Sequence, residues 1–397
     1  MPQISQRGTE MPSSPIRKLA PLAAQAKKEG VKVYHLNIGQ PDLPTPQQAL
    51  DALKDIDRKT LEYSPSEGYP FLREKLAAYY HKVGLKDITE NDIIVTSGGS
   101  EALLFAFFSC MNPGDEMIMV EPGYANYISF AATAGVKVVS ITSKIEDGFA
   151  LPSMEAFEQA ITPRTKAILL CNPNNPTGYV YSAAELEQLR QLVLKYDLYL
   201  IADEVYREFT YGAEPSISAM SLGIPENVIL VDSVSKRYSE CGIRIGMLVT
   251  HNRQIHQTVM KFAQARLSPP LLGQIGAAAS IEGTEAYSKE CYEEYNARRD
   301  FFIKGLNEIP GVFSPMPNGA FYTVANLPVE DAEDFCKWCL TDFRLDGETF
   351  MVAPAAGFYR HPEMGRHQVR MAYVLKKEDL ARCLVLLREA LKAYNAR

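Results

Sequence analysis

A lysine, two serines and an arginine that lie close together in the sequence could bind a phosphorylated aldehyde. Ser233, Ser235 and Lys236 directly follow the apolar run 228–231, and Arg244 comes shortly after them. A short continuous apolar run is typical of a buried strand. An amine at the end of such a strand loses part of its affinity for protons and can condense with an aldehyde, while hydroxyls and a guanidinium bind phosphate. These residues predict pyridoxal 5'-phosphate (PLP) attached to Lys236.

The PLP ring makes two further demands, and residues that follow two other predicted strands meet them. The ring nitrogen stays protonated only beside a carboxylate, and Asp203 ends the apolar run 198–202. Sites in open α/β sheets form at such carboxyl ends. Tyr206 comes next along the chain and would donate a hydrogen bond to the ring hydroxyl. Asn175 would donate another from the turn 172–178, which prolines and asparagines make rigid.

The phosphate also needs the start of a helix. Gly98, Gly99 and Ser100 join a predicted strand at 93–96 to a predicted buried helix at 101–108. Free backbone N–H groups and the helix dipole attract phosphate at such a position, and glycines allow its close approach. This segment therefore predicts the second half of a phosphate cup.

Together and in this order, these motifs resemble those of the fold-type I, PLP-dependent aminotransferases of class I/II, the aspartate aminotransferase superfamily. The resemblance extends from about residue 14 to residue 394. It implies ping-pong transfer of an amino group from an L-amino acid to a 2-oxo acid such as 2-oxoglutarate, with Lys236, Asp203 and Tyr206 in catalysis. A PLP-dependent C–S β-lyase or related elimination enzyme on the same fold is the alternative, because it would share these motifs. A non-enzymatic regulator on this fold would need a DNA-binding domain, and residues 1–40 offer no room for one.

The resemblance also implies roles for residues that the motifs alone do not assign. Tyr124 matches the aromatic residue stacked on the ring, and Gly39 lies in the segment that resembles the loop closing over substrate. Arg370 resembles the arginine that binds the substrate α-carboxylate, beside Asn175. Tyr63 resembles the tyrosine that reaches the phosphate of a neighbouring subunit. A homodimer with sites at the subunit interface is therefore expected.

The donor stays open between aspartate-type and aromatic or broad-range amino acids. Aspartate-specific members of the family use an additional cation for the distal carboxylate. One subgroup places a lysine where this chain has Ser100, and another places an arginine at a position that falls on Ala263, counted from the proline pair 269–270. Arg266 is near that position and could supply the charge. For an aromatic or broad-range donor, Tyr124 and Tyr322 would form walls of the pocket.

The elements around these motifs predict an α/β fold with a second, smaller part. Strands and helices alternate through residues 45–290, which predicts a large PLP-binding domain with a mostly parallel central sheet flanked by helices. The resemblance implies a sheet of the seven-stranded type. Residues 291–397 read as a smaller α+β domain, and residues 1–44 as an N-terminal arm that contributes to it, so this domain is discontinuous. A charged helix at 285–309 would bridge the two domains.

Composition narrows the class of protein. The chain has 397 residues, 46% of them hydrophobic, and a net charge of -7. This charge argues against a nucleic acid or an anionic membrane as a partner. Seven cysteines without a regular framework fit a reducing compartment, so we expect a cytoplasmic protein. The scattered histidines have no metal-ligand spacing, and no metal is expected.

Overall fold

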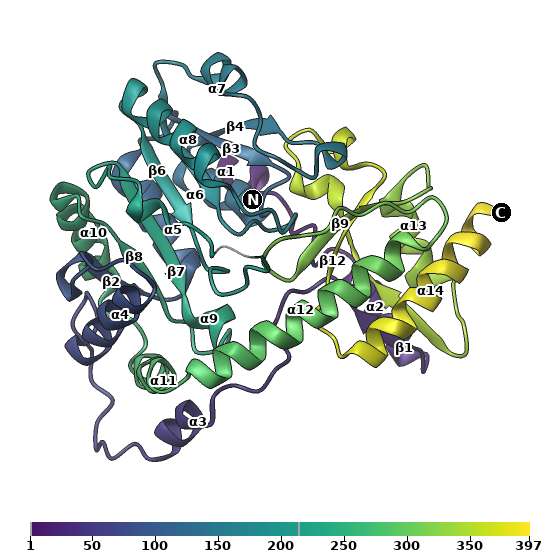
Figure 1. Cartoon of the computed structure of the whole chain (residues 1–397), viewed down its shortest axis with the longest axis horizontal. Coiled ribbons are helices and arrows are strands. Elements are labelled where there is room, and N and C mark those ends of the chain that lie inside the picture. Colours follow the sequence, from purple (N-terminus) through teal and green to yellow (C-terminus); the bar gives the residue numbers. More distant parts are fainter. Residues whose placement is uncertain (1, 213–214) are drawn as a thin grey trace.

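A seven-stranded sheet forms the centre of the larger part of the molecule, the large lobe (Figure 1). The computed structural model describes residues 2–212 and 215–397. The strands are ordered β2 (Ile93–Thr96), β8 (Gly246–Val249), β7 (Val228–Ser233), β6 (Tyr199–Asp203), β5 (Thr165–Cys171), β3 (Glu116–Glu121) and β4 (Lys137–Thr142). Only β8 runs antiparallel to its neighbours. The mostly parallel sheet and its flanking helices confirm the predicted α/β class.

Helices cover both faces of this sheet, which explains why its strands are apolar runs rather than alternating ones. Along β5, Ile168 and Leu170 enter one hydrophobic core, whereas Leu169 and Cys171 enter the core of the opposite face. The first core includes side chains of α4 (Pro70–Lys82), α7 (Met154–Ala160), α8 (Ala183–Tyr196) and α11 (Leu271–Ile281), and the second those of α5 (Gly99–Cys110), α6 (Asn126–Ala134) and α10 (Arg253–Arg266). The carboxyl ends of the strands are therefore held in place from both sides.

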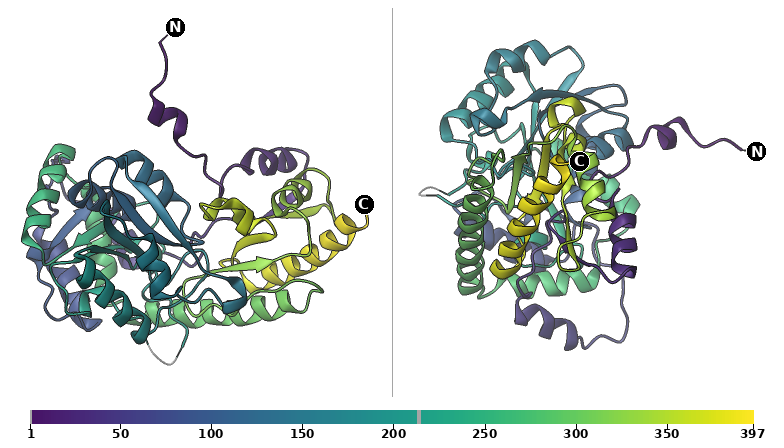
Figure 2. Two further views of the ribbon diagram at one scale, coloured as in Figure 1. Left: turned by 90° about the horizontal axis from the view of Figure 1, so that it is seen from above. Right: turned by 90° about the vertical axis from the view of Figure 1, so that its right-hand side faces the viewer.

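A smaller group of elements, the small lobe, joins the two ends of the chain. Strand β1 (Lys32–His35) pairs in parallel with β10 (Glu348–Met351), and β12 (Gln368–Ala372) lies between β11 (Ala353–Pro354) and β9 (Tyr322–Asn326). Helices α2 (Ala20–Lys28), α13 (Ala332–Thr341) and α14 (Lys377–Asn395) complete it. Helix α12 (Glu285–Asn307) runs from the large lobe along the small one (Figures 1 and 2). The lobes meet at the carboxyl ends of the central strands.

Two elements differ from the sequence expectations in informative ways. Apolar and basic residues alternate over residues 16–29, which predicts a short amphipathic helix, but α2 begins only at Ala20, and residues 15–19 form turns in which Pro15 and Ile16 pack against the rest of the protein. The apolar run 350–353 predicts one strand, but the structure divides it between β10 and β11. The chain changes sheets at this point, since β10 pairs with β1 while β11 pairs with β12.

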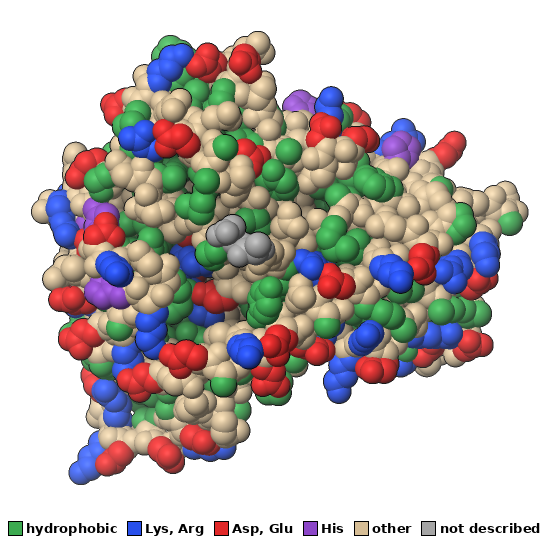
Figure 3. Space-filling view, in the orientation of Figure 1, with side chains coloured by type: hydrophobic (Ala, Val, Ile, Leu, Met, Phe, Trp, Pro, Cys, Tyr) green, Lys and Arg blue, Asp and Glu red, His purple; other side chains and the backbone are tan. Residues whose placement is uncertain are grey.

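The face shown in Figure 3 has acidic and basic side chains interspersed over both lobes, with hydrophobic side chains between them. It presents no continuous basic surface. In the described part of the chain, no helix has both the length and the apolar character that a membrane span requires.

Candidate active site

A cavity of about 830 Å³ opens between the lobes, at the carboxyl ends of β5, β6 and β7. A volume of this size is typical of sites for small ligands and cofactors. Twelve of the predicted site residues line it: Gly39, Gly99, Ser100, Tyr124, Asn175, Asp203, Tyr206, Ser233, Ser235, Lys236, Arg244 and Arg370. The fold thus brings together residues that lie more than 300 positions apart in the sequence.

Lys236 enters the cavity from α9 (Val234–Arg237), the single helical turn that follows β7. Its Nζ donates a hydrogen bond to the carbonyl oxygen of Gly39 at 2.9 Å and lies 3.7 Å from Cys241 Sγ. The side chain is only partly buried, not fully buried as its position after an apolar strand suggested. The amine is therefore held at the cavity wall by one backbone carbonyl that a ligand can replace.

The loop residue Gly39 cannot be replaced without moving the cavity wall. A Cβ at this position would overlap the phenol of Tyr322. The Tyr322 hydroxyl donates to the Gly39 carbonyl at 3.3 Å, so the loop and strand β9 are in direct contact. Tyr322, expected only as a wall for aromatic donors, thus also fixes the loop beside Lys236.

Asp203 ends β6 with its carboxylate buried at the bottom of the cavity. Tyr127 Oη donates to Asp203 Oδ2 at 2.7 Å, and the backbone N–H of Val205 donates to Oδ1 at 3.3 Å. Burial raises the pKa of Asp203 to about 6, although these two hydrogen bonds act in the opposite direction. Such a carboxylate is well placed to accept a proton or a cationic N–H group. Tyr127 was missed in the sequence; its only signal is its position three residues after Tyr124, near the start of α6.

Asn175 and Tyr206, the pair expected at a ring hydroxyl, lie next to each other. Asn175 Nδ2 donates to Tyr206 Oη at 3.4 Å, and Tyr206 Oη is 3.0 Å from Tyr322 Oη. Burial raises the pKa of Tyr206 well above its ordinary value, so this phenol stays protonated and can donate. Asn175 also connects this pair to the next group, because its Oδ1 accepts a hydrogen bond from Arg370.

Arg370, on β12, is a buried cation without a carboxylate partner among the described residues. It is 1% exposed. Nη1 donates to Asn175 Oδ1 at 3.2 Å and Nη2 to the carbonyl oxygen of Asn37, while Nε has no acceptor. Burial lowers the pKa of this guanidinium, but an unpaired buried charge still favours the arrival of an anion. The arrangement suits a carboxylate that enters the cavity.

The opposite end of the cavity is built for a phosphate. Helix α5 begins at Gly99, and the backbone N–H groups of Gly99 and Ser100 have no acceptor within residues 2–212 and 215–397. The Arg244 guanidinium donates to the carbonyl oxygens of Ser97 and Cys241 and lies so close to Gly98 that a Cβ there would overlap it. Gly98 has φ +84°, a backbone conformation that glycine adopts freely.

Hydroxyl groups complete this end of the cavity. Ser233 Oγ and Ser235 Oγ are 2.8 Å apart and both residues line the cavity, as does Ser100. Free N–H groups at a helix start, hydroxyls and a guanidinium form the donor set that a phosphate dianion requires. With Lys236 and Asp203, the residues present fit PLP.

Some residues that the sequence singled out do not line this cavity, among them Tyr63, Ala263 and Arg266. Tyr63 is 77% exposed and does not reach the site of its own subunit. Arg266, at the end of α10, pairs with Glu101 at 3.4 Å and donates to two backbone carbonyls, those of Ser66 and Val95. Arg266 does not line the cavity of its own subunit, its charge is paired with Glu101, and Ala263 is fully buried.

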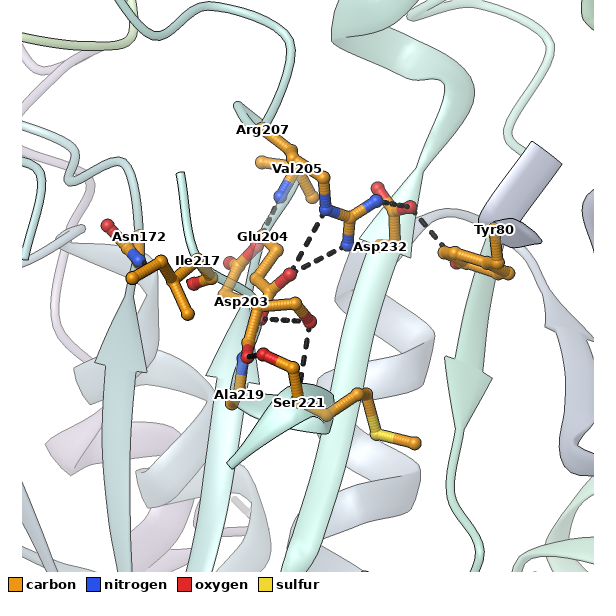
Figure 4. A network of polar contacts seen from close by, with 12 residues as sticks. Tyr80, Asn172, Asp203, Glu204, Val205, Arg207, Ile217, Ala219, Ser221 and Asp232 are labelled. Atoms are coloured by element: carbon orange, nitrogen blue, oxygen red, sulfur yellow. Dashed lines mark hydrogen bonds and ion pairs between the residues drawn. The ribbon is translucent and has the colours of Figure 1, made fainter. Parts of the chain in front are cut away.

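A buried ion-pair network adjoins Asp203 (Figure 4). Glu204 pairs with Arg207 at 2.7 Å, and Arg207 also lies 3.3 Å from Asp232. Asp232 pairs with Arg237 at 2.6 Å and accepts a hydrogen bond from Tyr80. Because Glu204 follows Asp203 and Arg237 follows Lys236, the network connects the backbones that carry both groups and fixes their separation.

The chain matches the family model "Aminotransferase class I and II" over residues 31–379. It is 30% identical to an aspartate aminotransferase of Pyrococcus horikoshii, over 98% of this chain and 97% of that protein. It is 32% identical to an aspartate/prephenate aminotransferase of Thermus thermophilus, over 91% and 92%. Among solved structures it is similar to an alanine aminotransferase from Pyrococcus furiosus, with a TM-score of 0.91, 30% identity and coverage of 98% and 100%.

Proposed function

Since the chain belongs to the class I and II aminotransferases, the family that its sequence resembles, we propose that it transfers the amino group of an aspartate-type L-amino acid to a 2-oxo acid such as 2-oxoglutarate. That it is a PLP-dependent aminotransferase with the fold of type I follows from the family match and from its structural neighbours. The C–S lyase alternative is not favoured, because the curated relatives at about this level of identity are named as aminotransferases. The aspartate-type donor is supported by the names of several relatives.

Each of these residues of the cavity has a separate role in the proposed reaction, and its contacts support that role. PLP, when bound, supplies the electron-withdrawing ring. Asp203 offers a carboxylate to the ring nitrogen, and Tyr206 and Asn175 offer donors to the ring hydroxyl. Arg370 binds the substrate α-carboxylate with two parallel N–H groups. The Lys236 amine, once free, moves the proton at the substrate Cα.

One observation carries this proposal: a lysine amine, a buried carboxylate and a buried guanidinium, which has no acidic partner among the described residues, all line the same cavity. An amine and a carboxylate alone occur in many sites. The guanidinium of Arg370 adds a place for the one anionic group that every α-amino acid and every 2-oxo acid shares.

A homodimer is the second part of the proposal. Tyr63 is too exposed to serve its own site, which supports a contact with the phosphate of a partner subunit. Exposed apolar side chains occur on the same connected segments: Leu61, Leu267 and Leu272. Ser66 Oγ donates to the carbonyl oxygen of Leu267 at 2.7 Å, which holds two of these segments together. Exposed apolar groups of this kind favour burial in an interface.

Two further expectations are retained as proposals. The large domain would comprise residues 45–290, and the small domain residues 1–44 with 291–397; the pairing of β1 with β10 supports the discontinuous second domain. A cytoplasmic location is supported by the cysteines, all seven of which are free thiols.

The donor is tested with a panel of L-amino acids, each incubated with PLP-loaded enzyme and 2-oxoglutarate, while the new 2-oxo acid and glutamate are quantified. Aspartate should give the highest kcat/KM, with oxaloacetate formed only when the acceptor is present. Lys236→Ala is the control: it should lose turnover and retain some PLP binding. Faster turnover of an aromatic donor than of aspartate would contradict the proposed donor class, and pyruvate with ammonia in the absence of an acceptor would contradict transamination.

A further inference from the structure

Arg17 lines the active-site cavity, although no sequence motif pointed to it. It belongs to the N-terminal segment 14–17, from which Ser14 and Ile16 also line the cavity. Figure 2 shows that the arm containing α1 (Gln6–Glu10) projects from the body and that the chain returns to it between the two lobes. The segment therefore forms part of the cavity wall between the lobes.

Three contacts hold this segment in place. Pro15 packs so closely on Gly357 that a Cβ at 357 would overlap its ring. Ile16 packs against the small core that contains Phe358, and its carbonyl oxygen accepts a hydrogen bond from Asn37 Nδ2 at 3.0 Å. Arg17 thus projects from an anchored backbone, even though its own side chain is exposed.

The position of Arg17 relates directly to the proposed α-carboxylate site. Asn37 connects the two, because its side chain binds the carbonyl oxygen of Ile16 while its own carbonyl oxygen accepts from Arg370 Nη2. Arg17 and Tyr124 both line the cavity. Burial raises the pKa of Tyr124 to about 12, and the positive charges of Arg370 and Arg17 both oppose this rise. Arg17 and Arg370 therefore line one cavity, and Asn37 joins the segments that carry them.

The four cations of the cavity can be assigned to different ligand groups. Arg244 is assigned to the phosphate of PLP, Lys236 to the aldehyde of PLP, and Arg370 to the α-carboxylate of the substrate. The guanidinium of Arg17 forms no hydrogen bond or ion pair with any residue that the structure describes. The only carboxylate among the described lining residues is that of Asp203, at the bottom of the cavity. One cation thus remains for one further anionic group.

We propose that Arg17 binds the side-chain carboxylate of a dicarboxylic amino acid, and the equivalent carboxylate of its 2-oxo acid. This inference rests on the aspartate-type donor proposed above and names the residue that selects it. Arg17 takes the role that the sequence suggested for Arg266, whose charge is already paired with Glu101. An arginine suits this role because its planar guanidinium can bind both oxygens of a carboxylate.

The test compares the binding of succinate, a dicarboxylate, with that of butyrate, a monocarboxylate of the same chain length. Both are titrated into PLP-loaded wild type and Arg17→Met, and the dissociation constants are read by calorimetry, so that turnover is not needed. Arg17→Met should weaken succinate binding about ten- to a hundredfold, as expected for one charge-assisted contact, and change butyrate binding less than about twofold. Lys18→Met is the matched control, since it removes the same charge from the neighbouring residue, which pairs with Glu333 outside the cavity.

Kinetics separate this inference from the proposed donor class. In Arg17→Met, kcat/KM for aspartate should fall by a similar factor, while that for alanine should stay within about twofold of wild type. If wild type prefers aspartate and succinate but Arg17→Met preserves both preferences, the assignment of Arg17 is wrong and the donor class stands. If wild type itself binds succinate no better than butyrate, both are wrong. Arg17→Lys should recover part of the succinate affinity, and an unchanged loss in that variant would also count against a role for the charge.

Discussion

Removing the charge of Arg370 should weaken substrate binding strongly but change the free energy of unfolding little. In the free enzyme this guanidinium is 1% exposed, has an unpartnered Nε and contacts no carboxylate of a described residue. Its remaining contacts are one amide oxygen, one backbone carbonyl and two aromatic rings, those of Tyr322 and Phe358. The cost of burying the charge is therefore only partly offset until a substrate carboxylate arrives.

The magnitude follows from this arrangement. Removing one partner of a buried, hydrogen-bonded charge pair costs about 2–5 kcal/mol of binding free energy. Because about 1.4 kcal/mol corresponds to a factor of ten, kcat/KM of Arg370→Met for any α-amino acid should fall about 30- to 4000-fold. Arg370→Lys keeps the charge but not the two parallel N–H groups, so its loss should be intermediate. The free energy of unfolding should change little, since the deleted side chain contributes an unpaired charge along with its hydrogen bonds.

Two measurements check this reasoning. Stopped-flow recording of the cofactor absorbance during the amino-donor half-reaction gives the substrate dependence, and urea denaturation of the substrate-free enzyme gives the free energy of unfolding. PLP content is measured in each variant, because a lost cofactor would imitate a lost substrate contact. The reasoning is refuted if PLP-loaded Arg370→Met keeps kcat/KM within about threefold of wild type.

Two further predictions concern carboxyl groups with raised pKa values. The hydroxyl of Tyr127 lowers the pKa of Asp203, which burial raises to about 6. Tyr127→Phe should therefore leave Asp203 more protonated, and the dissociation constant of PLP should rise about tenfold or more. Equilibrium dialysis should show a greater loss of PLP affinity at pH 6 than at pH 8, and equal losses of affinity at both pH values would contradict this prediction. Burial raises the pKa of Glu240 from 4.5 to about 7, opposed by a hydrogen bond from Ser280. A raised folded-state pKa stabilises the protein below the unfolded-state pKa, and this contribution is lost as the pH rises through 7. The free energy of unfolding of Glu240→Gln, measured by urea denaturation, should therefore match that of wild type near pH 4.5 and exceed it by about 3 kcal/mol at pH 8. A difference that does not depend on pH would contradict the assignment.

The parts of this protein that the sequence predicts best are those fixed by local pattern. The strand predicted at 93–96 is β2 with the same bounds, because it is a short apolar run that is buried on both faces of the sheet. The residues at the ends of β5, β6 and β7 meet in one cavity because parallel strands end at one edge of a sheet. Asn175, Asp203 and Lys236 could therefore be selected from strand order alone.

What the sequence does not predict are contacts between segments that are far apart. The hydrogen bonds of Asn37 to Arg370 and of Tyr322 to Gly39 join residues separated by 333 and 283 positions, and no spacing rule links them. The same limit explains Arg266, which was a candidate by proximity in sequence. Its guanidinium is turned toward Glu101 of the neighbouring helix α5, and this contact joins segments that are far apart in the sequence.

The net charge of the chain and the charge of its cavity have opposite signs, and this contrast explains how an acidic protein can bind anionic ligands. The chain has a net charge of -7. The described residues of the cavity nevertheless include four cationic side chains, Arg17, Lys236, Arg244 and Arg370, and a single carboxylate, that of Asp203. A concave site with walls of low dielectric constant concentrates the field of its own charges, so the local excess outweighs the distant surface charges. Each anionic group that enters must therefore be matched to a particular cation, and the separation between these cations, rather than the total charge, determines which acids fit.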